Sequence, residues 1–443
     1  EWPVIEELSP DPVDIFSLPV SMHDEQKISE TYLLQEDIWL RFLDLDRNEA
    51  FDDRLWIVVG DQMTVERIRG IQMESTESET PFDRRDWMLP SPAWFHIAMN
   101  CSYTLMRTHW SRNEDQQHLD HCLSDDIRFW GLKGISDTKP KFYLLQQLIF
   151  RSFRARVLAL MMQEMIDRNW LSLDNAPADI SRVDAVGRAI QCLTSEQYLE
   201  LIDAVYDKAF TAKAWRNTDD PAFTTMVRML KEMELFLTIR RAIRRMDIGH
   251  LRRAVDHLII PFSGAGQHNY GREMIFMRWL LSDAADPALQ RAILATGVIN
   301  PSGKHGKAVA SDEQLELHNL DYSLDISQFA NSTHDLAATF RKVSLCREAG
   351  KVLRKTFETG IGREASGAHS IKSAATDVFS LAEKLVSDGL AKEQSGRTDC
   401  GLSKDIHQAG AHVLRAKVEA LNAVNRGYSK GVSRVVAVNA EDG

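Results

Sequence analysis

The sequence predicts a mostly α-helical fold with a small β component. Two observations predict it: apolar residues recur at helical spacing through most of the middle of the chain, and one short, unbroken apolar run has the pattern of a buried strand. The chain has 443 residues, of which 44% are hydrophobic and 26% are charged, as in ordinary globular proteins. This length suffices for two or three domains or for one large elaborated domain.

The apolar run extends from Leu55 to Val59, and Gly60 ends it. A continuous apolar run bounded by glycine is typical of a strand buried on both faces. Asp61 follows at the carboxyl end of this strand, where α/β sheets position ligands and catalytic groups. Thr64 is the expected N-cap of the next helix. From the spacing alone, capping of a turn or helix is the favoured role of Asp61.

The segments around this strand have mixed patterns. Residues 1–23 contain four prolines and are expected to form an extended arm or linker. The following stretch is expected to contain a helix over Asp24–Leu45, the strand, a helix from Thr64, a short strand over Trp87–Leu89 that Pro90 and Pro92 interrupt, and a helix over Ile97–Trp110.

The rest of the chain is predicted to be almost entirely helical. Apolar residues at helical spacing predict helices over Lys141–Trp170, Asp179–Cys192, Glu196–Phe210 and Phe223–Met246. Further helices are expected from Asn269 to Leu281, before Gly297, after Ser311, and over Leu336–Phe357 and Ser370–Asp388. The last twenty or so residues are expected to be a frayed tail.

Charge and cysteine content narrow the class of protein. The net charge of −11 is not that of a free-standing nucleic-acid-binding protein. The five cysteines contain no CxxC pair, which favours a reducing compartment, nuclear or cytoplasmic. No apolar run is long enough to cross a membrane, so no membrane partner is expected. The first residues show no signal-peptide pattern. The first residue is Glu and not Met, so we expect a fragment of a longer protein.

One short stretch is locally basic. It contains six arginines, which are Arg240, Arg241, Arg244, Arg245, Arg252 and Arg253. Arg241, Arg244 and Arg245 share one face at helical spacing. Two interpretations remain open: a solvated face paired with the abundant carboxylates, or a ridge that contacts DNA phosphates.

A pair of distant carboxylates could carry metal chemistry. Asp61 follows the strand, and Glu273 lies one turn into a helix after a glycine-rich turn. Carboxylates that converge in this way are what a divalent metal needs for phosphoryl transfer. The glycine-rich GAGQHNYG segment itself is not a Walker loop, since no GK[ST] follows.

Histidines form a second candidate group. His96, His109, His118 and His121 occur near Cys101 and Cys122, but only one closely spaced pair is present, so surface or core histidines are favoured over a zinc site. His96 follows a buried aromatic pair and is the best single candidate for a site residue. Glu316, His318 and Asn319 lie within four residues on a helix, where they cannot all face one way.

Four motifs occur in a fixed order: GDQMTVERIRG, WFHIAMN, PFSGAGQHNYGREM, and a VINPSGKHG loop followed by DEQLELHN. In this order they resemble an uncharacterised domain family, expanded in basidiomycete fungi and associated with mobile elements. Members of that family resemble transposases with an RNase H-like α/β core that a large helical insertion interrupts. The resemblance covers Glu25 to Asp325.

The resemblance implies a nuclear, DNA-directed, metal-dependent nuclease or transposase ancestry. Carried over by position, it makes Asp61 and Glu273 the second and third metal-binding carboxylates, with Mg²⁺ or Mn²⁺ as the metal, and it makes His96 a residue that lines the site. Together with the sequence patterns described above, it gives an arm over 1–23, a partial core over 24–110, a helical insertion over 111–260, core helices that close the site over 261–330, and a helical C-terminal region with a frayed tail over 331–443.

One departure limits this expectation. An RNase H-like core needs a first Asp on a central strand, but none of the eight aspartates among residues 1–54 follows a strand-like apolar run. The core is therefore expected to be truncated. One hypothesis is an ancestrally DNA-cleaving and strand-transferring domain that is incomplete or inactive here. The alternatives are a domesticated, non-catalytic helical module that binds DNA or protein, and a helical scaffold without a nucleic-acid role. The sequence leaves the oligomeric state open.

Overall fold

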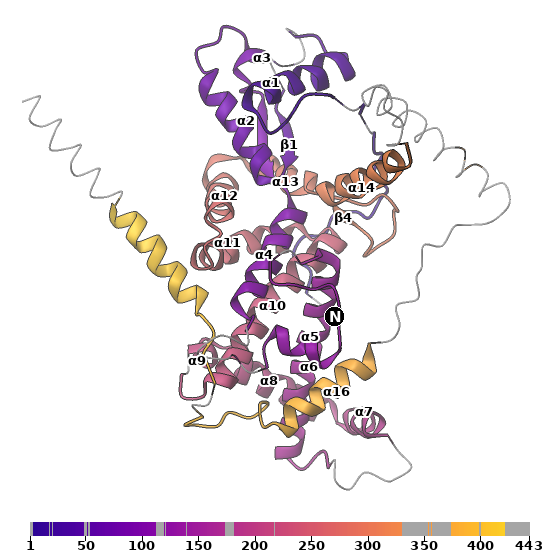
Figure 1. The fold of residues 1–443 in the computed structure, drawn as a ribbon, viewed down its shortest axis with the longest axis vertical. Helices are drawn as coiled ribbons and strands as arrows, with labels where there is room; N and C mark the ends of the chain where they lie inside the picture. Colours follow the sequence, from indigo (N-terminus) through magenta and orange to yellow (C-terminus); the bar gives the residue numbers. More distant parts are fainter. Residues whose placement is uncertain are drawn as a thin grey trace, which may run out of the picture. The chain divides into compact units, whose positions relative to one another are not determined.

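Most of the chain that the structure describes is helical and little of it is strand, which confirms the predicted mostly helical fold with a small β component. The structure is a computed structural model (Figure 1). It describes residues 3–16, 18–19, 21–47, 51, 54–111, 119, 121–138, 140–172, 181–216, 218–329, 353, 356, 374–397 and 400–420. They fall into two compact units, each built from three separate segments.

Unit 1 comprises residues 1–98, 239–253 and 276–371, and unit 2 comprises residues 99–238, 254–275 and 372–443. The unit boundaries fall within α4 (Trp94–Thr108), α10 (Pro221–Arg245), α11 (Ile248–Gly264) and α12 (His268–Trp279). The predicted domain ranges differ from these units, and an RNase H-like core with an insertion remains a prediction.

The first part of unit 1 is a small βαβ arrangement. It contains α1 (Ile28–Glu36), a π-helical turn η1 (Asp37–Phe42), β1 (Trp56–Gly60), α2 (Gln62–Glu74), α3 (Pro81–Arg84) and β2 (Met88–Pro92). Strand β1 confirms the predicted strand, and it pairs in parallel with β2, with Trp56 opposite Met88 and Gly60 opposite Pro92.

Two local expectations in this region were wrong. Helix α2 begins at Gln62 with Asp61 as its N-cap, so Thr64 is not the cap. Pro90 and Pro92 do not interrupt the second strand, because β2 includes both. Strand β2 pairs only with β1 in its two-stranded sheet, so it is an edge strand, where proline is tolerated.

An aromatic cluster forms the core of this arrangement. Trp39, Phe51, Phe82 and Trp87 are buried together, and the ring centroids of Trp39 and Trp87 lie 5.1 Å apart. Arg85 lies fully buried beside the cluster, and its guanidinium covers the rings of Tyr32 and Phe82. Burying several aromatic rings is a large part of what stabilises such a small sheet.

The N-terminal segment of unit 1 is extended and docked. The buried Asp247 carboxylate accepts hydrogen bonds from the backbone N–H of Ile5 and Glu6, at 3.2 and 3.1 Å. It also accepts from the N–H of His250, so it caps α11. Farther along, the Asn300 side chain donates to the carbonyl of Pro10. The predicted arm is therefore held in place by charge-assisted hydrogen bonds within unit 1.

The last segment of unit 1 begins at residue 276. It contains a π-helical turn η2 (Leu280–Ala284), α13 (Pro287–Thr296), a short antiparallel pair of β3 (Val298–Ile299) and β4 (Val309–Ala310), and α14 (Ser311–Phe329). Glu313 in the first turn of α14 accepts two hydrogen bonds from the Arg240 guanidinium, at 2.9 and 3.0 Å. Both side chains are buried, so this ion pair is part of the interior.

Unit 2 is helical throughout its described part. Its further helices are α5 (Leu123–Phe129), α6 (Phe142–Asp167), α7 (Arg182–Cys192), α8 (Ser195–Ala209), α9 (Ala212–Arg216), α16 (Ala375–Ser387) and a helix over residues 406–420. Side chains of α6, α8, α10 and α16 form its apolar core. The helices predicted over the middle of the chain are thus confirmed, with ends that differ by a few residues.

A close backbone contact joins α11 to the helix over residues 406–420 within unit 2. A Cβ atom added at Gly264 would lie 1.9 Å from the Ile406 carbonyl oxygen, and one added at Gly410 would lie 2.0 Å from the Ile260 carbonyl oxygen. No real Cβ tolerates such distances, so both positions require glycine. The Lys404 ammonium also donates to the Gly264 carbonyl, at 2.7 Å.

Some expectations fall outside the described residues, among them the helix over Leu336–Phe357 and the terminal tail. The helix expected over Ser370–Asp388 is present as α16. Among the described residues, no helix has the length and apolarity that a membrane-spanning segment requires.

Candidate functional site at the ends of two parallel strands

The parallel pairing of β1 and β2 brings two predicted site residues to one edge. Asp61 follows β1 directly, and His96 lies in the first turn of α4, just after β2. The backbone N–H of Ala93 donates to the Gly60 carbonyl at 2.9 Å, which extends the pairing to this edge. Carboxyl ends of parallel strands are the usual place of sites in α/β sheets.

Asp61 acts as a helix cap in this structure. Its Oδ1 accepts a hydrogen bond from the Thr64 backbone N–H at 2.7 Å. Capping of this kind contributes about 1 kcal/mol to helix stability. The capping role that spacing alone favoured for Asp61 is thereby confirmed. It is Oδ1, and not the other carboxylate oxygen, that makes the capping hydrogen bond.

Asp312 of α14 is the residue that organises the edge. Its carboxylate accepts hydrogen bonds from the backbone N–H groups of Phe95 and His96, at 3.0 and 3.1 Å. Its Oδ2 also lies 2.9 Å from Nδ1 of His96. Asp312 thus caps the N-terminus of α4 and orients the imidazole. Sequence reasoning missed it, because 216 residues separate the two partners.

Acidic groups surround the His96 imidazole. Its Nε2 lies 3.9 Å from a Glu316 carboxylate oxygen, on the side away from Asp312. Burial lowers the pKa of His96, but the hydrogen bond to Asp312 and the charge of that carboxylate raise it. The charges of Asp61 and Glu316 raise it further, and the net effect is a pKa above the ordinary value of a histidine. The carboxylates around the ring therefore stabilise its protonated form.

Replacing Asp312 with alanine is expected to lower the free energy of unfolding by about 2–3 kcal/mol. The reason is that two backbone N–H groups and the imidazole lose a charged acceptor in a site where Asp312 is 7% exposed. Urea unfolding followed by tryptophan fluorescence measures this change. Unfolding curves that match those of the unmodified protein would contradict the capping role.

The same site predicts a pH dependence. A group whose pKa is raised by folding stabilises the protein fully below its unfolded pKa, and the stabilisation disappears as the pH rises through the folded pKa. We therefore expect His96→Gln to destabilise the protein more at about pH 5.5 than at about pH 8.5. The exposed His268 offers a matched control, since His268→Gln should show no such difference.

The carboxylates at the strand ends accept hydrogen bonds from backbone N–H groups in this structure. No group of three or more His, Cys, Asp or Glu side chains among them could hold a metal ion. The oxygens of Asp312 are occupied by N–H donors, and Asp61 caps α2. Glu273 is buried in unit 2, whereas Asp61 belongs to unit 1, so their pairing around Mg²⁺ or Mn²⁺ remains a prediction.

The other predicted histidines have structural partners. His109 is fully buried, with Nε2 3.0 Å from the Glu232 carboxylate, as expected of a core histidine. His121 lies 3.6 Å from Asp388. Cys101 and Cys122 are buried free thiols, and burial raises the pKa of both. His118 lies outside the described residues.

Residues 1–369 match the model of one protein family, described as a family of unknown function (DUF6589). The chain belongs to this family. No curated protein and no solved structure matches it. The match covers most of the chain and supports the expected membership of an uncharacterised domain family.

The arginines of this DUF6589 member lie where α10 ends and α11 begins. We call residues 240–253 the arginine corner. Arg240 is buried with Glu313, and Arg245 lies 2.9 Å from the Glu7 carboxylate of the docked arm. The other four predicted arginines are exposed, namely Arg241, Arg244, Arg252 and Arg253. The corner therefore contains both structural and solvent-facing cations.

Proposed function

We propose that this chain is a non-catalytic, helical DNA-binding module of mobile-element origin. The observation that carries the proposal is the exposure of four arginines on one short corner of unit 1. Among the described residues, no carboxylate forms an ion pair with Arg244 or Arg253. Exposed arginines without acidic partners are suited to contacts with DNA phosphates.

The geometry of the corner supports this use. Arg241 and Arg244 share a face of α10 at a spacing of three residues. Met246 turns the backbone with a φ of 57°, and Asp247 then caps α11, which carries Arg252 and Arg253. The scaffold that presents the cations is thus fixed by local hydrogen bonds. A local basic corner can bind phosphates although the whole chain is acidic.

The state of the strand-end acids supports a role without catalysis. A cleavage site of the predicted ancestry would need carboxylates free to bind a metal. Here Asp61 and Asp312 cap helices, and Asp312 holds His96. In the proposed function this edge stabilises unit 1, and the arginine corner contacts DNA.

Replacing Arg244 and Arg253 together with alanine is expected to weaken binding to duplex DNA roughly tenfold, with little dependence on sequence. The slope of log affinity against log salt should fall by about 2, because two phosphate contacts are lost. Fluorescence anisotropy with a labelled duplex at several salt concentrations measures both quantities.

Arg188→Ala provides a matched control, because Arg188 is an exposed arginine on α7 in unit 2. Binding and salt slope that are the same in the double variant and in the unmodified protein would overturn the proposal. Cleavage of the duplex in millimolar Mg²⁺ that disappears in Asp61→Asn would instead support the ancestral nuclease activity.

A further inference from the structure

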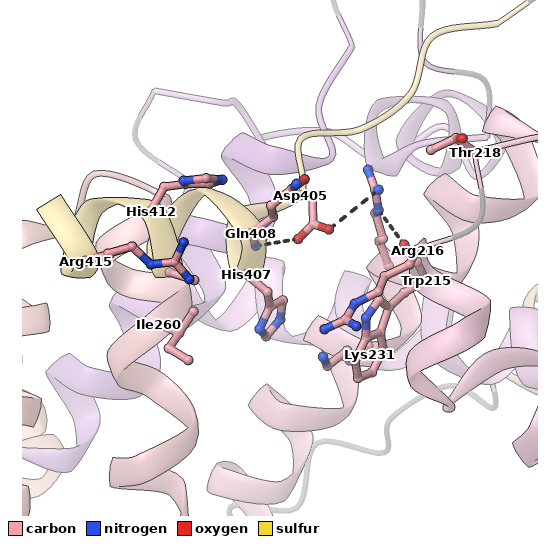
Figure 2. A pocket seen from close by; sticks show the side chains of 12 residues that line it. Trp215, Arg216, Thr218, Lys231, Ile260, Asp405, His407, Gln408, His412 and Arg415 are labelled. Carbon is pink, nitrogen blue, oxygen red and sulfur yellow. Dashed lines mark hydrogen bonds and ion pairs between the residues drawn. The ribbon is translucent and has the colours of Figure 1, made fainter.

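A cavity of about 690 Å³ opens within unit 2, and none of the residues of the strand-end site lines it. Side chains from α9, α10, α11 and the helix over residues 406–420 line it. Figure 2 shows His412 and Arg415 on one side of this pocket, and Trp215, Arg216 and Lys231 on the other. Its volume is in the range of sites for nucleotide-sized ligands.

The lining of this pocket is strongly cationic. It contains Arg216, Arg228, Lys231 and Arg415, with two histidines, against the single carboxylate of Asp405. These cations come from three separate helical elements and converge on one volume. Such convergence is costly unless an anion compensates it, and it favours a multiply charged ligand over a single carboxylate.

The one carboxylate among the lining residues of the pocket already has partners within the protein. Asp405 Oδ1 accepts a hydrogen bond from the Gln408 N–H at 2.8 Å, which caps the helix over residues 406–420. Its other oxygen lies 3.7 Å from the Arg228 guanidinium (Figure 2). Arg228 is buried and also donates to the carbonyls of Trp215 and Ser403. Arg228 and Asp405 therefore build the wall of the pocket.

The other cations lack an acidic partner. Among the described residues, no carboxylate lies within ion-pair distance of Arg216, Lys231 or Arg415. The Lys231 ammonium lies over the Trp215 ring, 2.8 Å from its centroid, and the His407 ring lies parallel to the same indole at 6.1 Å. A cation–π contact orients Lys231, and the carboxylates of Asp405, Glu232 and Glu234 act on its charge from beyond ion-pair distance.

The titration of the lining agrees with this geometry. Burial lowers the pKa of Lys231 to about 8. Burial and the charge of Lys231 also lower the pKa of His407. Burial is the largest cause of both shifts, and the charge of Arg216 on Lys231 and that of Lys231 on His407 act in the same direction. A bound anion would reverse them.

We propose that this pocket binds a small molecule that carries a diphosphate or triphosphate group. Arg216 and Arg415 supply planar forks that match phosphate oxygens, and Lys231 supplies a point charge. The pocket is independent of the arginine corner, since it lies in the other unit. It adds a ligand to the proposed DNA-binding function and does not depend on it.

Isothermal titration calorimetry of the full chain with pyrophosphate, and separately with ATP, tests the proposal. Arg415→Ala and Lys231→Met are each expected to weaken binding about ten- to hundredfold. Lys417→Ala is the matched control, because Lys417 is an exposed cation on the same helix outside the pocket lining. It should bind like the unmodified protein. Circular dichroism melting of each variant establishes that it is folded.

Measuring pyrophosphate binding at several pH values distinguishes the role of Lys231 from a general effect of the charge of the protein. Pyrophosphate binding should weaken as the pH rises above about 8, where free Lys231 loses its proton. Lys231→Arg should retain binding at high pH, because arginine stays protonated. If pyrophosphate binding by the unmodified protein and by Lys231→Arg weakens in the same way as the pH rises, the role of Lys231 is contradicted.

Two outcomes overturn the proposal. They are the absence of pyrophosphate and ATP binding by the unmodified protein, and equal affinities of the unmodified protein and Arg415→Ala. The Arg244 and Arg253 double variant should bind pyrophosphate normally. Failure of DNA binding and failure of the phosphate pocket are therefore separately observable.

Discussion

Replacing Arg240 with alanine is expected to lower the free energy of unfolding by about 3–5 kcal/mol. The Arg240 and Glu313 side chains are only 9% and 5% exposed, and two hydrogen bonds join them. Removing the guanidinium leaves the Glu313 carboxylate buried without its charge partner, which costs most of the desolvation energy. Urea unfolding gives the free energy, and hydrogen exchange of α14 locates the loss.

The double variant Arg240→Met with Glu313→Leu is the control. It removes both charges and keeps the volume, so its stability should recover most of what Arg240→Ala loses. An Arg240→Ala protein that is as stable as the unmodified one, but binds DNA more weakly, would contradict the structural role. It would return Arg240 to the predicted DNA-contacting set.

Replacing Gly264 with alanine is expected to detach the helix over residues 406–420 from α11. The new Cβ would lie 1.9 Å from the Ile406 carbonyl oxygen and 2.7 Å from the Gly410 nitrogen. These are backbone atoms that cannot rotate away, so an overpacking cost of about 1–3 kcal/mol is expected. Pyrophosphate binding should also be lost, because this helix supplies His412 and Arg415 to the pocket.

Gly187→Ala in α7 is the matched control. A Cβ added at Gly187 meets nothing within 4 Å, so the substitution should stabilise its helix by up to about 1 kcal/mol. Hydrogen exchange of residues 406–420 distinguishes the two variants. Unchanged protection of this helix in Gly264→Ala would show that the close contact is not required.

Local features of this fold were predictable from the sequence because they depend on residues that are only a few positions apart. The helical spacing of apolar residues located α6, α8 and α10, and the apolar run that ends at Gly60 located β1. The cap at Asp61 follows from residue type and a spacing of three residues. Strand β2 was harder to predict, since two prolines are unusual in a strand and are tolerated here only at an edge.

Asp61 and His96 were predicted as site residues, but their partners and the pocket could not be predicted, because the residues are joined across long separations. Nothing in the spacing of His96 and Asp312, 216 residues apart, indicates their contact. Arg240 resembles its exposed neighbours in the sequence, and only the position of Glu313 makes it a buried residue. The pocket cations are scattered over α9, α10 and the helix over residues 406–420, where each alone has the pattern of a surface charge.

The docking of the N-terminal arm on Asp247 has a consequence for biosynthesis. Ile5 and Glu6 are translated 242 and 241 residues before their acceptor. Between them the ribosome must make residues 99–238, all of which belong to unit 2. At roughly 5–20 residues per second, this interval lasts on the order of ten seconds. The arm therefore cannot reach its docked place in unit 1 until this whole segment of unit 2 has been translated.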